Sequence, residues 1–380
     1  MEKETMQPGK KLLNAIPPIN LNYVTQLTTS LGITQQLSAR NEHAVHTLNN
    51  NARALLALCM HYDLTGNPKD LDAIHTYFDF VRHCLQPEGY FLNYTDSKGN
   101  FTELNNFTNL ADANGRAIWA LGYLVSLQHK LPAELVANAE SIIQKVLSKV
   151  NTLHSTRAIA FIMKGLYYYH KVKQSSESLS LIRVLADKLV QLYKHESERG
   201  WEWFERYLAY NNSVLPNALL CASLATGNRA YADIARTSFR FLLNQMLTNE
   251  GFSSKRDHLP GREEETQQAE PSLEVCYIIL ALGDFYEVYG AEEYLLQMEK
   301  SFAWFLGGNP HRQQFYHSES GACYSGDIAD DSSTATACST LAYLLSRLTL
   351  ERCNRSGVLH ASNGVQPNEL NNDGLQQHLA

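Results

Sequence analysis

The chain first turns back on itself at Leu64-Thr65-Gly66-Asn67-Pro68-Lys69-Asp70-Leu71, between two apolar stretches. Glycine ends one predicted helix there, and proline enters the next. A similar turn lies at Ala225-Thr226-Gly227-Asn228-Arg229-Ala230-Tyr231-Ala232, and a looser one at Val288-Tyr289-Gly290-Ala291-Glu292-Glu293-Tyr294-Leu295. Because the same helix–turn–helix unit recurs, the sequence predicts a fold built from repeated helical hairpins.

Apolar residues at helical spacing place these hairpins along the chain. Ala54, Leu55, Leu58 and Cys59 give such a stripe in the first of them. We expect helix 333–349 to pair with a short helix near 21–31, which would close a ring. The predicted helices are 45–62 with 69–86, 112–128 with 133–150, 154–171 with 177–194, 214–226 with 229–248, 271–288 with 291–306, and 333–349.

Loop lengths distinguish a closed ring from an open α-solenoid. Loops within hairpins are short, whereas those between hairpins are long, at 87–111, 195–213, 249–270 and 307–332. Long loops in a compact domain are usually functional, and solenoid repeats usually keep short loops on both edges. We therefore predict an all-α (α/α)6 toroid of six hairpins, with the helices that follow the long loops on the inside. The expected boundaries are a flexible arm at 1–18, one barrel domain at 19–350 and a disordered tail at 351–380.

Composition narrows the partners and the compartment. The 380 residues carry a net charge of −7, which argues against nucleic acid or an anionic membrane as partner. Neither a signal peptide nor an apolar run long enough to span a membrane is found, so we expect a cytoplasmic protein. The seven Cys are scattered along the sequence, and we expect them to be reduced, buried thiols. The fourteen His do not occur in the closely spaced pairs that bind zinc. We expect no metal and no cofactor.

The strongest functional candidate is the loop Gly200-Trp201-Glu202-Trp203-Phe204-Glu205-Arg206-Tyr207-Leu208-Ala209-Tyr210-Asn211-Asn212. Aromatic faces stack on sugar rings, and amides bind sugar hydroxyls, so the sugar-binding candidates here are Trp201, Trp203, Tyr210 and Asn211. Glycoside cleavage needs two carboxylates about 5–10 Å apart, which makes Glu202 and Glu205 catalytic candidates. Alternatively, the loop packs over helix ends, and its carboxylates pair with Arg199 or Arg206.

Other candidates lie at the starts of the predicted inner helices and in the first long loop. Asp112 and Glu274 are the candidate catalytic partners, although helix capping could explain Asp112 and the helix dipole could explain Glu274. Three successive Asn at 49–51 cost helix propensity, which favours a role in a site. The remaining binding candidates are Asn50, Arg53, Arg116 and Tyr94.

Four motifs in order carry a resemblance to a known family. They are Asn51-Ala52-Arg53-Ala54-Leu55, Asp112-Ala113-Asn114-Gly115-Arg116-Ala117-Ile118-Trp119-Ala120-Leu121-Gly122, Trp201-Glu202-Trp203-Phe204-Glu205 and Ser339-Thr340-Leu341-Ala342-Tyr343-Leu344. Together they resemble the six-hairpin glycosidase-like (α/α)6 proteins, which occur alone or fused to GT-B-type glycosyltransferases. The resemblance implies a toroid fold, a carbohydrate ligand and a glycosyltransferase as partner.

The chain departs from that family pattern at several acidic positions. Asn49 and Asn50 stand where the family usually has two Asp, and Cys338 stands where it tends to have Glu. An amide cannot act as a carboxylate acid or base. The chemistry would then depend on the remaining carboxylates, or this member binds sugars without turning them over.

Three functions follow as hypotheses. The first is an intracellular glycoside hydrolase-like enzyme that acts on an oligosaccharide with loop carboxylates at the barrel mouth. The second is an inactive paralogue that binds glycans or assists a glycosyltransferase. The third is a sugar 2-epimerase-like enzyme, which needs an inward-facing His base such as His154 or His258. A second carboxylate near Glu202 or Glu205 would favour the first.

Overall fold

The computed structural model describes residues 16–36, 46–150, 155–248, 251–252, 270–325 and 335–362. Most of the predicted arm, and the part of the predicted tail after residue 362, lie outside these ranges. The same holds for parts of the third and fourth long loops, including His258, and for His154.

Helices make up most of this chain and alternate between two layers. The inner helices are α3 (Leu48–Thr65), α6 (Ala111–Ser126), α8 (Thr156–Lys173), α10 (Val214–Thr226), α12 (Pro271–Tyr289) and α14 (Ala337–Ser362). The outer helices are α2 (Asn22–Leu27), α4 (Asp70–Cys84), α7 (Ala133–Leu147), α9 (Ser176–Glu196), α11 (Arg229–Met246) and α13 (Glu292–Phe302). One further short helix, α5 (Leu104–Phe107), lies in the first long loop.

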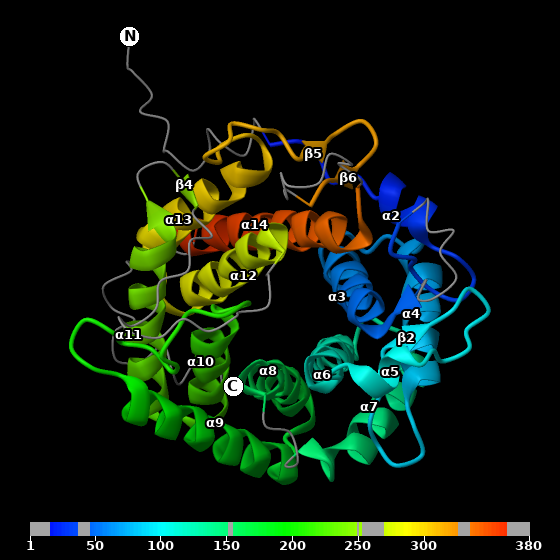
Figure 1. Ribbon diagram of the computed structural model, residues 1–380, viewed down its shortest axis with the longest axis horizontal. Helices are drawn as coiled ribbons and strands as arrows, with labels where there is room; N and C mark the ends of the chain where they lie inside the picture. Colours follow the sequence, from blue (N-terminus) through cyan, green and yellow to red (C-terminus); the bar gives the residue numbers. More distant parts are fainter. Residues whose placement is uncertain are drawn as a thin grey trace.

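The inner helices form a closed ring. Each packs against the next, from α3 through α6, α8, α10 and α12 to α14, and α14 returns to pack against α3 (Figure 1). The short α2 packs against α14, as expected for the pair that closes the ring. The (α/α)6 toroid predicted from the sequence is therefore confirmed, with the helices after the long loops on the inside.

Local sequence explains where the hairpins turn. Gly66, Gly227 and Gly290 follow α3, α10 and α12 in the left-handed conformation, with φ of +63°, +70° and +63°. A residue with a Cβ is strained there, whereas glycine lets the helix end in a tight cap. At the opposite ends, Thr47 and Ser155 accept a hydrogen bond from the backbone of the first turn of α3 and α8.

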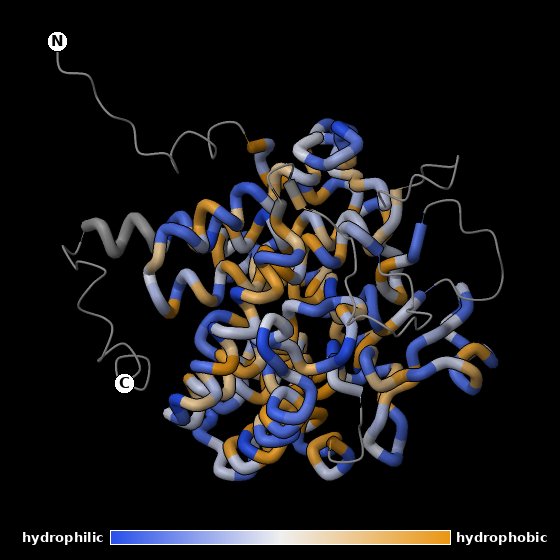
Figure 2. The backbone as a smooth tube through the Cα atoms, turned by 60° about the vertical axis from the view of Figure 1, so that its left-hand side comes forward, coloured by the Kyte–Doolittle hydropathy of each residue, from blue (hydrophilic) through white to orange (hydrophobic). Residues whose placement is uncertain are grey.

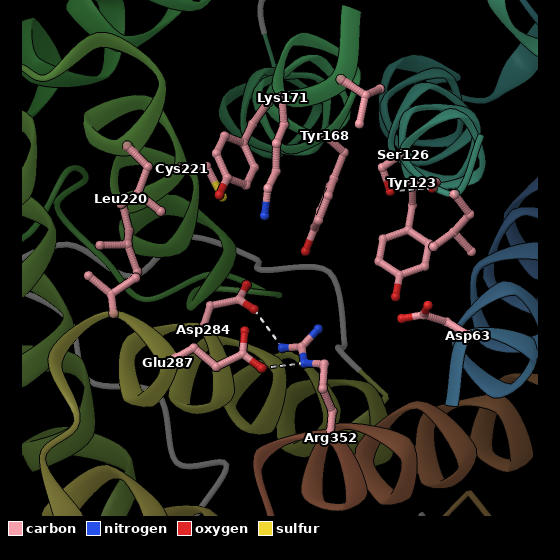
Figure 3. Close-up of a pocket in the computed structure, with 15 residues that line it drawn as sticks. Asp63, Tyr123, Ser126, Tyr168, Lys171, Leu220, Cys221, Asp284, Glu287 and Arg352 are labelled. Atoms are coloured by element: carbon pink, nitrogen blue, oxygen red, sulfur yellow. Dashed lines mark hydrogen bonds and ion pairs between the residues drawn. The ribbon is translucent and has the colours of Figure 1, made fainter. Parts of the chain in front are cut away.

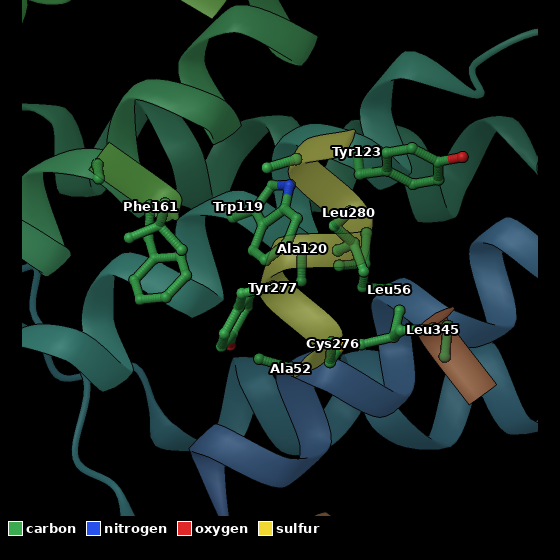
Figure 4. Close-up of a cluster of buried hydrophobic side chains, with 14 of the residues drawn as sticks. Ala52, Leu56, Trp119, Ala120, Tyr123, Phe161, Cys276, Tyr277, Leu280 and Leu345 are labelled. Carbon is green, nitrogen blue, oxygen red and sulfur yellow. The ribbon is translucent and has the colours of Figure 1, made fainter. Parts of the chain in front are cut away.

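The bore of the ring is filled by side chains. The rings of Trp119, Phe161 and Tyr277 contact one another, with centroids 5.5–6.3 Å apart, and smaller residues such as Ala52 and Leu280 pack around them (Figure 4). Hydrophobic residues gather toward the interior and hydrophilic ones toward the outside (Figure 2). The toroid is thus a packed core with two separate ends.

Two glycines let α6 and α8 approach backbone to backbone. A Cβ at Gly122 would lie 2.1 Å from the carbonyl oxygen of Gly165, and a Cβ at Gly165 would lie 2.4 Å from that of Ile118. No side chain fits at either distance, so this helix pair depends on glycine at both positions.

Three short strand pairs occur where we expected no strand. They join β1 (His46–Thr47) to β2 (Tyr94–Thr95), β3 (Leu247–Thr248) to β4 (Gly251–Phe252) and β5 (Tyr316–His317) to β6 (Ala322–Cys323). Each strand has two residues, which is too short to leave an alternating pattern in the sequence. The first two pairs join a helix end to a long loop, and the third lies within the fourth long loop.

The last helix is longer than predicted. We expected it to end at 349 and a disordered tail to begin at 351, but α14 continues to Ser362, so the expectation was wrong for residues 351–362. Contacts distant in sequence hold this extension. Arg352 forms ion pairs with Asp284 and Glu287, and Arg355 donates a 2.5 Å hydrogen bond to the carbonyl oxygen of Leu64.

Candidate active site

All six inner helices begin at the same end of the ring, which we call the mouth. Their first turns bring polar side chains from α3, α6, α8, α12 and α14 to this end. The free N–H groups of helix starts carry partial positive charge, so carboxylates are stabilised here. The residues that follow form one connected network.

The centre of the network is a hydroxyl between two arginines. The Tyr277 hydroxyl accepts hydrogen bonds from Nε of Arg53 at 3.3 Å and from Nε of Arg116 at 3.2 Å. Asn49 accepts from Nη1 of Arg116 at 2.8 Å, and Asn50 accepts from Nη1 of Arg53 at 3.3 Å. We call Arg53, Tyr277 and Arg116 the arginine bridge, because it links α3, α12 and α6 across the ring.

One end of the bridge meets Asp112. Nη2 of Arg116 lies 3.6 Å from this carboxylate, which also accepts hydrogen bonds from Ser155 at 2.7 Å and from the Tyr210 hydroxyl at 3.0 Å. The Asp112 side chain keeps 15% of its surface exposed. Burial, together with the Asp112 charge, raises the pKa of Tyr210 to about 12, so its hydroxyl stays a donor.

The other end of the bridge meets Glu270. This carboxylate accepts hydrogen bonds from Ser339 at 2.6 Å and from Ser272 at 3.1 Å. Nη1 of Arg53 lies 3.9 Å from Sγ of Cys338, the neighbour of Ser339. Burial and then the Glu270 charge raise the pKa of the Cys338 thiol well above its usual range, so the thiol is neutral. Two partly exposed carboxylates thus stand at opposite ends of one polar chain.

Most residues of this network lie in the part of the chain that matches a known family. A family profile described as the β-L-arabinofuranosidase, GH127 catalytic domain, matches residues 54–357, which is most of the chain. The chain belongs to the GH127 family. No curated protein matches it in sequence.

Solved structures add neighbours of the same fold to this GH127-family chain. A sugar epimerase from a ruminal bacterium is 11% identical with a TM-score of 0.67 and covers 95% of this chain and 100% of its own. The cellobiose 2-epimerase of Bacillus thermoamylovorans is 14% identical with a TM-score of 0.66, covering 91% and 98%. The α-1,6-mannanase GH76A of Salegentibacter is 12% identical with a TM-score of 0.57, covering 91% and 98%. These likenesses show the shared toroid.

In this GH127-family chain, Glu205 supports a loop. It forms an ion pair with Arg157 and accepts from the Thr156 hydroxyl at 2.9 Å, while its second oxygen is buried without a partner. Arg157 also binds the carbonyl oxygen of Tyr210 and the side chain of Asn212. The alternative from the sequence paired the loop carboxylates with Arg199 or Arg206. For Glu205 the partner is Arg157 instead.

Glu202 points elsewhere. It lies beside Tyr193 of the outer helix α9, where burial and then the Glu202 charge raise the pKa of that hydroxyl. The loop is not helical at this point, because Trp201 pairs with Glu198 in an isolated β-bridge. Glu202 and Glu205 therefore do not form a carboxylate pair on one helical face, and Glu202 does not join the arginine bridge.

The two tryptophans are packed into the protein. Trp201 is 6% exposed and Trp203 is 0% exposed, and both contact Phe241 of α11. The Trp201 ring also donates a 2.7 Å hydrogen bond to the carbonyl oxygen of Glu205. Since their faces are covered, we withdraw both as stacking surfaces for a sugar. Farther along the same loop, Tyr210 reaches Asp112, and the next residue, Asn211, is in the left-handed conformation with φ of +50°.

The remaining predicted residues divide between support and site. Glu274, in the first turn of α12, accepts a hydrogen bond from the backbone N–H of Asn211, and both residues are buried. Tyr94 lies in β2 opposite Thr47, which caps α3. Asp112 follows Leu110, the N-cap of α6, and so does not cap its own helix.

Several residues of the network were not predicted from the sequence, among them Arg157, Glu270 and Tyr277. Glu270 precedes Pro271 at the start of an inner helix, a position that could have marked it. Tyr277 sits within an apolar run and left no signal. Among the described residues, no group of three or more His, Cys, Asp or Glu could hold a metal ion. In the same part of the chain no helix has the length and apolarity to cross a membrane.

Proposed function

We propose that this GH127-family protein is a glycoside hydrolase that binds an oligosaccharide at the mouth and cleaves it between Asp112 and Glu270. The observation that supports this most is the placement of these two carboxylates, both partly exposed and at opposite ends of the arginine bridge. Glycosidases use such a pair on either side of the bond that breaks. This assignment replaces Glu202, Glu205 and Glu274 as catalytic residues. Glu205 and Glu274 hold the loop, and Glu202 lies beside Tyr193 of α9.

The surroundings of the two carboxylates suggest different roles. Asp112 accepts from two hydroxyls and faces a guanidinium, an environment suited to carrying negative charge. We assign it as the carboxylate that attacks the sugar or activates water. Glu270 forms no ion pair with a described residue and accepts from two serine hydroxyls, so of the two carboxylates we assign it as the proton donor to the leaving oxygen.

The other mouth residues would bind the sugar. Arg53 and Arg116 present guanidinium N–H groups, and Asn49 and Asn50 present amides, all suited to bidentate contacts with hydroxyls. Tyr210 holds its hydroxyl beside Asp112 and remains our choice among the aromatic residues. The GH76A mannanase neighbour is known in complex with α-1,6-mannotriose, which makes mannosides sensible probes beside L-arabinofuranosides.

Binding without turnover is the second candidate, because amides occupy positions 49 and 50 where the resemblance leads us to expect acids. The epimerase hypothesis has less support. Among the described residues no His contacts the arginine bridge, and His154 and His258 lie outside them. A cytoplasmic location and a glycosyltransferase partner remain predictions from sequence.

The test compares hydrolysis of 4-nitrophenyl β-L-arabinofuranoside, 4-nitrophenyl α-D-mannopyranoside and α-1,6-mannotriose by wild type, Asp112→Asn and Glu270→Gln. We expect each variant to lose at least about 100-fold in kcat/KM, the usual contribution of a general acid or base. Glu202→Gln is the matched control and should keep the wild-type rate.

Two other results would contradict this assignment. Saturable binding of these sugars in calorimetry with no product would establish the non-catalytic candidate. Wild-type rates in both Asp112→Asn and Glu270→Gln would show that this carboxylate pair is the wrong one.

A further inference from the structure

The end of the ring opposite the mouth holds a cavity, which we call the base pocket. Its volume is about 290 Å³, far above the roughly 30 Å³ that one water occupies in the liquid. All six inner helices contribute to it from their C-terminal halves, and Figure 3 shows their side chains converging. The polar lining residues are Asp63, Tyr123, Ser126, Tyr167, Tyr168, Lys171, Asp284, Glu287 and Arg352.

Two tyrosine hydroxyls point into this pocket without a partner. Tyr123 is 6% exposed, and neither its hydroxyl nor that of Tyr168 has a hydrogen-bond partner among the described residues (Figure 3). Burial raises the pKa of both, so both stay protonated donors. Both hydroxyls face the open space of the pocket, so both are available to donate to a polar occupant.

The charges around the pocket are already matched. Arg352 lies 2.8 Å from Asp284 and 2.7 Å from Glu287, and Lys164 adds a contact to Asp284 at 3.7 Å. Asp63 is paired with Lys130 outside the pocket. A cationic ligand would find no uncompensated carboxylate and would face the ammonium group of Lys171, which projects into the pocket (Figure 3).

An anionic ligand fits no better. The guanidinium of Arg352 is occupied by two carboxylates, which leaves Lys171 as the one cation of the lining without such a pair. In addition, inner helices α3, α6, α8, α10 and α12 end close to the pocket, and the partial negative charge of helix C-termini opposes an anion.

We propose that the base pocket binds a small neutral polyhydroxylated molecule of monosaccharide size. Such a ligand needs donors, acceptors and a flat face together. Lys171 and the tyrosine hydroxyls donate, Asp63 and Asp284 accept, and the rings of Tyr123 and Tyr168, with centroids 5.0 Å apart, supply aromatic surface. The volume lies at the small end of ligand pockets, about 300–1,000 Å³, which excludes a long oligosaccharide.

This site is independent of the one proposed at the mouth. The aromatic cluster of Trp119, Phe161 and Tyr277 fills the bore between them, so a ligand in one does not reach the other (Figure 4). Binding at the base therefore does not depend on the mouth being catalytic, and substitutions of the pocket tyrosines distinguish a ligand at the base from a ligand at the mouth.

The test is calorimetric titration of D-mannose, L-arabinose and myo-inositol into the double variant Asp112→Asn/Glu270→Gln. We expect saturable binding of at least one of them with one molecule per chain. Adding Tyr123→Phe or Tyr168→Phe should weaken it about 3- to 10-fold, the worth of one hydrogen bond. Tyr169→Phe is the matched control, because that neighbouring hydroxyl donates to Glu140 and lies outside the pocket.

Several results would overturn the proposal. Absence of saturable heat with all three probes would mean that the pocket holds only water. Binding of inorganic phosphate or propylammonium in place of the neutral probes would contradict the charge argument. Equal affinities in Tyr168→Phe and Tyr169→Phe would place the ligand elsewhere. All the Tyr→Phe changes keep the ring, and if Tyr123→Phe fails to fold, Tyr168→Phe decides the matter.

Discussion

Replacing Tyr277 by Phe removes one oxygen from the centre of the arginine bridge. That oxygen accepts from Nε of Arg53 and Nε of Arg116, and all three residues are buried. The phenylalanine ring would keep its packing against Trp119 and Phe161. The change therefore leaves the shape of the core intact and takes the shared acceptor from two guanidinium groups.

The expected loss follows from the geometry of the two bonds. A hydrogen bond to a charged group contributes about 1.5–3 kcal/mol. Both bonds are at the long end of the normal range, at 3.3 and 3.2 Å, so the lower figure applies to each. Tyr277→Phe should lower the free energy of unfolding by roughly 3 kcal/mol.

Urea unfolding followed by far-ultraviolet circular dichroism measures this change. Tyr62→Phe is the matched control, because its hydroxyl also makes one 3.3 Å bond, to the carbonyl oxygen of Lys130, but at an exposed site. We expect it to cost less than about 1 kcal/mol. A Tyr277→Phe protein within about 0.5 kcal/mol of wild type, the range of an ordinary surface change, would refute the bridge as a coupled unit.

Three further predictions concern the packing, the loop and the pH dependence. Gly122→Ala should lower the Tm and reduce the free energy of unfolding by about 3 kcal/mol or more, because the new Cβ would lie 2.1 Å from the carbonyl oxygen of Gly165. An unchanged Tm in calorimetry would contradict this close approach of the two helices. Arg157→Met should cost about 3–5 kcal/mol by leaving the Glu205 carboxylate unpaired, and adding Glu205→Met should recover part of it in urea titrations. Burial lowers the pKa of His46, so the unfolded chain binds the proton more readily and the free energy of unfolding should fall as the pH drops below about 6.5. In His46→Gln the free energy of unfolding should depend less on pH between pH 8 and pH 5. An equal pH dependence in both proteins would show that other groups cause it.

The hairpins could be predicted because their signals are local. Gly66, Gly227 and Gly290 end helices wherever they stand, and apolar spacing needs only a few neighbours. The C-terminal end of α14 could not be predicted from such local signals. Its last turns are polar, and ion pairs of Arg352 with residues about 65 positions earlier hold them in the helix.

The site was predictable only where a motif places the residue on an inner helix. Arg53, Asp112 and Arg116 follow from such positions and meet in the network. Trp201 and Trp203 were wrongly predicted to bind sugar. Their position next to charged residues in the sequence does not show that both rings pack against Phe241. Glu205 was likewise assigned to chemistry because its partner, Arg157, lies 48 residues away in sequence.

The most direct test of the proposed function is a crystal structure of the Asp112→Asn protein soaked with α-1,6-mannotriose or an L-arabinofuranosyl disaccharide. We predict a sugar at the mouth, with a glycosidic oxygen within hydrogen-bond distance of Glu270 and ring hydroxyls on Arg53 and Arg116. A sugar that contacts Glu202 or Glu205 instead, with the arginine bridge left uncontacted, would contradict the assignment of Asp112 and Glu270 as the reacting pair.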